Sequence, residues 1–193
     1  MKSVYNFVVT PKGERYNNSK QIGDKELIIN TEVYNHKYIN REAIVISTPI
    51  IGEMDIKPGD TVITHFNVFR RWYNIKGEEK NSRSYFDENT YLISFDQIFL
   101  YKRDKDWIAP EGYCFIQPIK DTDQFNTEVE KPIMGIVKYS DGTVNVGDVI
   151  GYNPNTECEF IIDGVKLYRI LSNLITIKYE HQGNEETYNP SWA

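Results

Sequence analysis

The sequence predicts an all-β protein, and three observations support this prediction. Aromatic residues account for 13% of the 193 residues while Ala is scarce, a composition that favours strands over helices. Runs of four to seven β-forming residues alternate with Gly, Pro, Asn and Asp, which is typical of a small barrel or sandwich. No segment shows a sustained apolar stripe with the 3.6-residue period of a helix.

The expected strands follow one another along the whole chain. In order, they cover Tyr5–Thr10, Ala43–Ser47, Thr61–Phe66, Tyr91–Phe95, Ile98–Lys102, Tyr113–Gln117, Ile133–Tyr139, Val149–Tyr152, Glu157–Ile162, Val165–Ile170 and Leu174–Tyr179. The clearest turn is Asp163-Gly164, because Asp-Gly between two β-forming runs is a strong signal of a two-residue hairpin.

Four sequence landmarks occur twice in the same order, which indicates an internal repeat. The matched pairs are Phe7–Pro11 with Cys114–Pro118, Glu42–Val45 with Met134–Val137, Gly59–Ile63 with Gly147–Gly151, and Phe95–Lys102 with Leu171–Lys178. In each Gly-Asp pair, Gly supplies the positive φ that a turn before a strand needs. We expect Asp60 and Asp148 to stabilise these turns rather than to take part in catalysis.

The repeat predicts two copies of one β-domain, residues 1–104 and 105–181, followed by a polar tail at 182–193. The tail is expected either to be disordered or to dock on a neighbour. Only the first copy carries a long polar segment, residues 12–32, which we expect to be a mobile loop. It also carries residues 70–86, an expected extended hairpin tipped by Lys76–Lys80, which is either a contact surface or a solvated decoration.

Three large apolar residues, Leu27, Ile28 and Ile29, lie near the end of the polar loop, after Gly23. Two interpretations remain open for them. They form a simple edge strand, or they are an apolar tag that the loop presents to a partner.

Residues 144–180, VNVGDVIGYNPNTECEFIIDGVKLYRILSNLITIKYE, resemble the C-terminal half of GroES-type co-chaperonins, the chaperonin-10 family. In that family a V-x-V-G-D turn leads into a strand and a hairpin, and an ending matched here by Leu167 to Ile177 closes the barrel. The first copy resembles the N-terminal half, whose loop ends in an Ile-Val-Leu-like tripeptide, matched by Leu27–Ile29 and followed by Asn40–Val45. The resemblance implies two tandem small GroES-like β-barrels.

The resemblance also implies a function. The protein would form an oligomeric lid on a GroEL-type chaperonin and assist ATP-dependent folding, docking through Leu27, Ile28 and Ile29 with Gly23 before them. The chain departs from the family in lacking a Gly-Gly pair before the tripeptide and a docking loop in its second copy, where residues 120–131 are short and acidic. The segments matching the family's roof are also short, at Pro49–Glu53 and Ser140–Gly142, so a standard sevenfold lid does not follow.

Two further hypotheses belong to other classes. One is a structural ring or connector, for example a virion component that uses GroES-like barrels without binding a chaperonin. The other is a monomeric binding module. Native mass with and without a chaperonin and nucleotide separates the three.

Composition excludes several other functions. A net charge of −6 argues against a nucleic-acid partner, and no apolar stretch approaches the roughly 20 residues of a membrane span. A cytoplasmic location is expected, in the bacterial host if the chain is phage-encoded, an origin that its many Asn, Lys, Ile and Tyr residues favour. His36, His65 and His181 lack metal-ligand spacing, and no catalytic motif occurs, so no metal, cofactor or enzymatic activity is expected. Cys114 and Cys158 are expected to be small buried hydrophobes.

Overall fold

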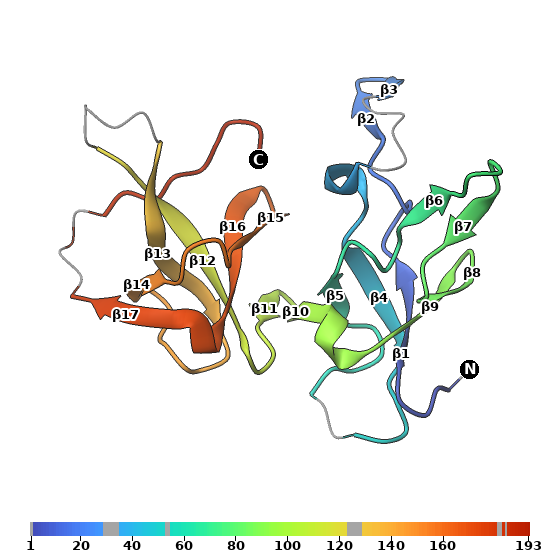
Figure 1. Ribbon diagram of the computed structural model, residues 1–193, viewed down its shortest axis with the longest axis horizontal. Helices are drawn as coiled ribbons and strands as arrows, with labels where there is room; N and C mark the ends of the chain where they lie inside the picture. The colour runs from blue at the N-terminus through green and yellow to red at the C-terminus, as the bar shows by residue number, and fades with distance from the viewer. Residues whose placement is uncertain (1, 29–34, 53–54, 123–128, 181–182, 184) are drawn as a thin grey trace. The chain divides into compact units, whose positions relative to one another are not determined.

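The computed structural model divides the chain into two compact units, Met1–Asp106 and Trp107–Ala193 (Figure 1). The described residues are 2–28, 35–52, 55–122, 129–180, 183 and 185–193. Within them the protein is all-β with two main antiparallel sheets, which confirms the predicted class. Its only helical turns there are three short 3₁₀ turns, η1 (His36–Tyr38), η2 (Phe95–Gln97) and η3 (Ser172–Leu174).

The first unit is built on a seven-stranded sheet with the order β11-β10-β5-β4-β1-β9-β8. These strands are β1 (Phe7–Pro11), β4 (Glu42–Ser47), β5 (Thr61–Thr64), β8 (Tyr85–Asp87), β9 (Thr90–Ile93), β10 (Ile98–Arg103) and β11 (Asp106–Ile108). The boundary between the units falls within β11. Two separate hairpins are β2 (Ser19–Ile22) with β3 (Lys25–Ile28), and β6 (Arg71–Tyr73) with β7 (Glu79–Asn81).

The second unit is built on a six-stranded sheet with the order β15-β16-β12-β13-β14-β17. Its strands are β12 (Tyr113–Lys120), β13 (Glu130–Ser140), β14 (Val149–Tyr152), β15 (Cys158–Ile162), β16 (Val165–Leu171) and β17 (Ile175–Tyr179). One cluster of its core consists of Cys114, Ile116, Val137, Ile150, Tyr152 and Ile170. In the part of the chain that the structure describes, neither sheet is seen to close into a barrel.

The two sheets have the same strand order, as the internal repeat predicts. The series β10-β5-β4-β1-β9-β8 in the first corresponds to β17-β14-β13-β12-β16-β15 in the second. Even the irregularities correspond, because the ladder shifts register after Val8 in β1 and after Phe115 in β12. Both copies therefore use one folding pattern.

The predicted match of Phe95–Lys102 with Leu171–Lys178 is wrong by one residue. Ile98 pairs with Thr64, and Ile175 pairs with Tyr152, the residue that corresponds to Thr64. Ile98 therefore corresponds to Ile175 and not to Leu174. The sequence offers two adjacent aliphatic residues at this point, and the backbone ladder decides between them.

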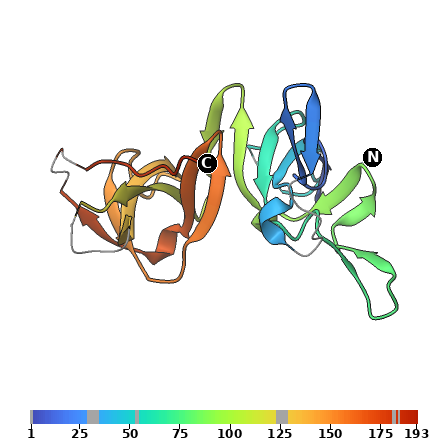
Figure 2. The ribbon, with the colours of Figure 1, turned by 90° about the horizontal axis from the view of Figure 1, so that it is seen from above.

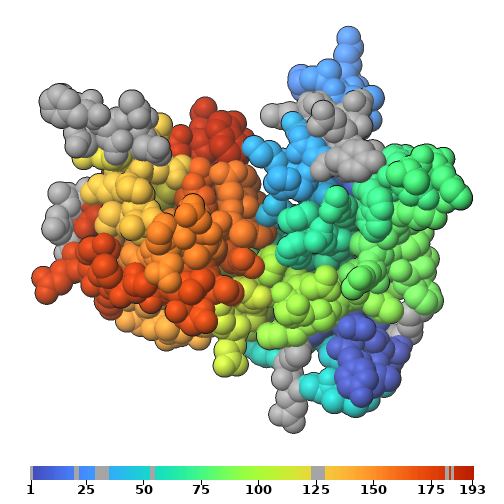
Figure 3. All heavy atoms as spheres, viewed as in Figure 1, coloured from blue at the N-terminus to red at the C-terminus, as the bar shows by residue number. Residues whose placement is uncertain are grey.

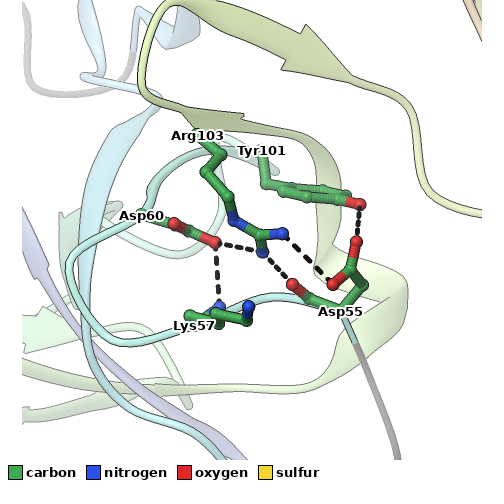
Figure 4. Close-up of polar contacts among 5 residues, drawn as sticks. All are labelled: Asp55, Lys57, Asp60, Tyr101 and Arg103. Atoms are coloured by element: carbon green, nitrogen blue, oxygen red, sulfur yellow. Dashed lines mark hydrogen bonds and ion pairs between the residues drawn. The ribbon is translucent and has the colours of Figure 1, made fainter.

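The first Gly-Asp turn is held by side-chain contacts of its aspartate (Figure 4). The Asp60 carboxylate accepts a hydrogen bond from the Lys57 backbone N at 2.8 Å, and it forms an ion pair with Arg103 at 3.0 Å. Arg103 also binds Asp55 at 3.1 Å, and this hydrogen bond lowers the pKa of the Asp55 carboxyl. The Tyr101 hydroxyl donates to Asp55 at 3.2 Å. In the structure Asp60 has the turn-stabilising role that the sequence predicts.

The second turn repeats this arrangement with a different cation. Gly59 and Gly147 adopt φ angles of 95° and 92°, in the left-handed region that favours glycine. Asp148 accepts a hydrogen bond from the Asn145 backbone N at 3.0 Å and pairs with Lys178 at 2.7 Å. The Lys178 hydrogen bond lowers the pKa of the Asp148 carboxyl. Both turns are therefore scaffold.

Two local predictions have different outcomes. The Asp163-Gly164 hairpin is confirmed, with φ of 49° and 76° at the two residues, as a type I′ turn requires. Cys114 is buried as expected, but Cys158 is exposed, so that part of the prediction was wrong. Cys158 begins the edge strand β15, where only Phe160 and Ile162 reach the core.

The described part of the C-terminal tail lies along β12 of its own unit. Thr187 forms a β-bridge with Ile119, and the Tyr188 backbone N donates to the Pro118 carbonyl at 2.8 Å. The Asn189 side chain donates to the Gly164 carbonyl at 3.0 Å. These contacts differ from both of the expected alternatives.

The close packing at Gly135 gives a testable prediction. A Cβ at this position would lie 2.7 Å from Ile116 Cδ1 and 2.8 Å from the Gln117 carbonyl oxygen. We expect Gly135→Ala to lower the free energy of unfolding of the second unit by about 1–3 kcal/mol through overpacking. Hydrogen exchange of β13 and β14 peptides should accelerate while β1 and β4 peptides stay unchanged. Ala43→Gly, at the corresponding place in the first unit, should give the reverse pattern.

Candidate functional site

The described residues 17–28 and 35–38 lie outside the first sheet, between β1 and β4, and contain the β2–β3 hairpin. We call residues 17–38 the projecting segment. The hairpin, in blue, lies beyond the sheet of the first unit (Figures 1 and 3). The two ends of the segment meet at its base, where Tyr16 forms a β-bridge with Ile39. The Asn17 backbone N donates to the Tyr38 carbonyl at 2.7 Å. The projecting segment is therefore closed at its base by backbone hydrogen bonds.

The predicted mobile loop contains ordered strand pairing. In the β2–β3 hairpin Ser19 pairs with Ile28 and Ile22 with Lys25. The turn is Gly23-Asp24, and Gly23 has a positive φ of 60°. Gly23 thus fixes the end of a hairpin, a role that the sequence did not suggest.

The structure places Leu27 and Ile28 on β3 and exposes both, at 53% and 68% of their surface. Ile29 lies outside the described residues. Successive side chains of a strand point to opposite faces, so Leu27 and Ile28 cannot enter one groove together. The strand pairing supports the edge-strand interpretation for Leu27 and Ile28. That they are a tag for a partner stays a prediction.

Sequence reasoning missed Ile22, which is 58% exposed. It pairs with Lys25, two residues before Leu27, so Ile22 and Leu27 share one face of the hairpin. An apolar residue directly before a Gly-Asp pair is the signal that could have found it. The face with Ile22 and Leu27 is the larger apolar surface of the described part of the projecting segment.

The buried side chain of Asn40 stabilises the base of the projecting segment by hydrogen bonds to the backbone. It is 4% exposed. Its Nδ2 donates to the Lys12 and Glu14 carbonyls at 3.0 and 2.8 Å, and its Oδ1 accepts from the Glu42 backbone N at 2.9 Å. One buried amide thus joins the strand that leaves the sheet to the strand that returns.

The second copy closes at the corresponding place. Lys120 pairs with Glu130 at the end of the β12–β13 ladder. Glu130 accepts hydrogen bonds from Lys166 at 2.6 Å and from the Tyr168 hydroxyl at 2.7 Å. Burial opposes the charge on Lys166, but its hydrogen bonds to Glu130, Tyr168 and Glu159 outweigh that effect and raise its pKa. A buried charged cluster therefore stands where the first copy begins its projecting segment.

Of residues 70–86, Arg71–Tyr73 and Glu79–Asn81 form the β6–β7 hairpin, which extends away from the first sheet (Figure 2). The predicted hairpin is too long at its C-terminal end, because Tyr85 and Phe86 belong to β8 of the sheet. The tip of the β6–β7 hairpin is residues 74–78 and not Lys76–Lys80, because the Asn74 side chain accepts hydrogen bonds from the Lys76 and Glu78 backbone N atoms at 2.9 and 3.0 Å. Ile75 at the tip is fully exposed.

Other kinds of site find little support. Among the described residues, no group of three or more His, Cys, Asp or Glu could hold a metal ion. A cavity of about 250 Å³ in the second unit is lined by charges of both signs, among them Lys120, Lys131 and Glu186. No helix in the described ranges is long and apolar enough to cross a membrane. The chain matches no known family model and no curated protein by sequence.

The role of Asn40 can be tested by removing its hydrogen bonds. Asn40→Ala leaves two carbonyls and one backbone N–H without their partner in a buried place. We expect the free energy of unfolding of the first unit to fall by about 1–3 kcal/mol. Urea unfolding should show the lower free energy of unfolding, and hydrogen exchange should show faster exchange in the β1 and β4 peptides. Asn40→Asp keeps the acceptor but loses both donors, so a stability equal to wild type would contradict the assignment.

Proposed function

We propose that this protein is a co-chaperonin that forms an oligomeric lid on a GroEL-type chaperonin and assists ATP-dependent protein folding. In this proposal each unit is a GroES-like barrel, and the first unit carries the docking element. The observation that carries the proposal is the β2–β3 hairpin, which holds Ile22, Leu27 and Ile28 exposed outside a sheet of duplicated topology.

The chemistry of the hairpin suits reversible docking. Burying one Leu or Ile side chain gains about 1.5–3 kcal/mol, so the apolar side chains of one hairpin face, Ile22 and Leu27, bind weakly on their own. Several copies in one ring raise the effective concentration of each hairpin and thereby the total strength. Weak single contacts and strong combined binding fit a lid that must come off in every ATP cycle.

An unpaired sheet edge supports assembly of several copies. In the described ranges β17 pairs with β14 alone, whereas its counterpart β10 pairs with both β5 and β11. Ile177 on β17 is 50% exposed. Uncovered edge strands are templates for pairing with another chain. We therefore assign β17 to the contact between copies in the ring.

The partner set follows from this role. A chaperonin and other copies of the chain are the partners, and a net charge of −6 makes a nucleic acid an unsuitable one. The place of action is the cytoplasm, which is that of the bacterial host if a phage encodes the chain.

Docking is tested with the double variant Leu27→Asp, Ile28→Asp and, separately, with Ile22→Asp. Charges cannot enter an apolar groove without a large desolvation cost, so we expect co-sedimentation with a GroEL-type chaperonin and ATP to fall at least about 10-fold. Ile75→Asp is the matched control, because it places the same charge on another exposed hairpin tip. Unchanged binding by the double variant would refute the docking site.

Assembly is tested with Ile177→Asp on the β17 edge, measured by light scattering. A charge there disfavours strand pairing, so the wild-type oligomer should dissociate to the 22.6 kDa chain. Ile161→Asp, on the opposite edge strand β15, should leave the oligomer intact. A large wild-type ring that ignores chaperonin and ATP would instead select the structural ring or connector.

A further inference from the structure

Arg15 lies between β1 and the projecting segment, and it contacts the β6–β7 hairpin. This residue directly precedes the base of the projecting segment. Its Nη2 donates to the Phe69 carbonyl at 3.1 Å and to Asn81 Oδ1 at 2.9 Å. Its guanidinium also lies over the rings of Tyr85 and Tyr91, 5.4 and 5.6 Å from their centroids. The arginine thus binds Asn81 of the β6–β7 hairpin and the tyrosine rings of the sheet at once.

Tyr16 makes the second connection. It is 7% exposed, and its hydroxyl accepts a hydrogen bond from the Arg71 backbone N at 2.9 Å. The Arg71 guanidinium lies 5.1 Å from the centre of the Tyr16 ring. Arg71 on β6 pairs with Asn81 on β7, so Arg15 and Tyr16 hold the same rung of the hairpin.

Two buried aromatic residues, Phe69 and Tyr91, lie next to Arg15. Phe69 and Tyr91 are fully buried and pack edge to face, with ring centres 4.7 Å apart. Burial raises the pKa of Tyr91 to about 12, so the ring beneath the arginine stays neutral. The Ser82 hydroxyl donates to the Val68 carbonyl at 2.6 Å and fixes the foot of the hairpin to the chain before it.

The second copy shows what happens without a projecting segment. Tyr168 occupies the position of Tyr91, since they pair with Ile116 and Val9 at corresponding places. There the cation over the ring is Lys166, 5.0 Å from the centroid, and it comes from the same strand β16. An arginine from outside the sheet therefore covers this tyrosine only in the copy that carries the projecting segment.

We infer that the β6–β7 hairpin is a clamp that positions the projecting segment, with Arg15 and Tyr16 as its positioning residues. These contacts give the base of the hairpin a structural role that neither of the two expected alternatives includes. A fixed base restricts the directions in which Ile22 and Leu27 are presented, and less freedom is lost when they dock. The link to docking rests on the proposed function, whereas the clamp itself does not.

Arginine is needed here for its shape as well as its charge. Its planar guanidinium donates several hydrogen bonds in a fixed geometry and stacks on aromatic rings, which a lysine ammonium cannot reproduce. Arg15→Lys therefore keeps the charge and the fold but loses the contacts with Phe69, Asn81 and Tyr85. Tyr16→Phe is milder still, because it keeps the ring under the Arg71 guanidinium and removes the hydroxyl, which accepts from the Arg71 N–H and donates to the Arg71 carbonyl at 3.5 Å.

The test is hydrogen exchange of the full-length chain, read at the backbone amides of Asn17 and Asn40. These amides close the base by donating to the Tyr38 and Arg15 carbonyls at 2.7 and 3.0 Å. We expect Arg15→Lys to accelerate both at least about 10-fold and Tyr16→Phe to do so less, with β12–β17 unchanged. Arg70→Lys, a matched change within the hairpin at a residue that contacts Trp72, should leave the base at its wild-type rate. Unchanged exchange in Arg15→Lys would overturn the inference, whatever the chaperonin result.

Chaperonin binding is measured in parallel to separate the two proposals. Arg15→Lys should weaken ATP-dependent co-sedimentation several-fold, less than Leu27→Asp with Ile28→Asp does. Faster exchange together with wild-type binding would overturn the link between the clamp and docking. Faster exchange in a protein whose wild type does not bind a chaperonin would support the clamp and refute the proposed function.

Discussion

The backbone ladder between neighbouring antiparallel strands is the constraint on which both units depend. Each strand's N–H and C=O groups must find partners once they are buried, and the ladder supplies them. Because side chains alternate along a strand, a slip by one residue would move every core residue to the solvent face. The two copies share strand order and even the bulges after Val8 and Phe115. Their different sequences therefore converge on one register.

The copies differ where the ladder ends and this constraint no longer applies. Beyond Pro11 the first copy leaves the sheet. Buried Asn40 and Arg15 hold in place the residues on either side of the projecting segment. At the corresponding point the second copy continues to Lys120 and Glu130 and closes with ionic contacts. The two copies share the sheet, and they differ in the polar side chains that hold the chain where the β-ladder ends.

Much of the scaffold could be predicted from the sequence, because apolar alternation and turn chemistry act locally. The Asp163-Gly164 hairpin and most strands follow from such signals. The β2–β3 hairpin could not be predicted so easily, since its strands are mostly polar and only its Gly-Asp turn marks it. The contact of Arg15 with Asn81 spans 66 residues, and no local pattern encodes a contact at that separation. The sequence match paired Ile98 with Leu174 instead of Ile175, because the two adjacent aliphatic residues cannot be told apart until the strand pairing is known.

The fusion of two sheets in one chain has a consequence for symmetry. Any closed ring of such chains contains an even number of sheets and half as many projecting hairpins. A ring with seven sheet positions therefore cannot be tiled by whole chains, and the rotational order of the ring equals the number of chains.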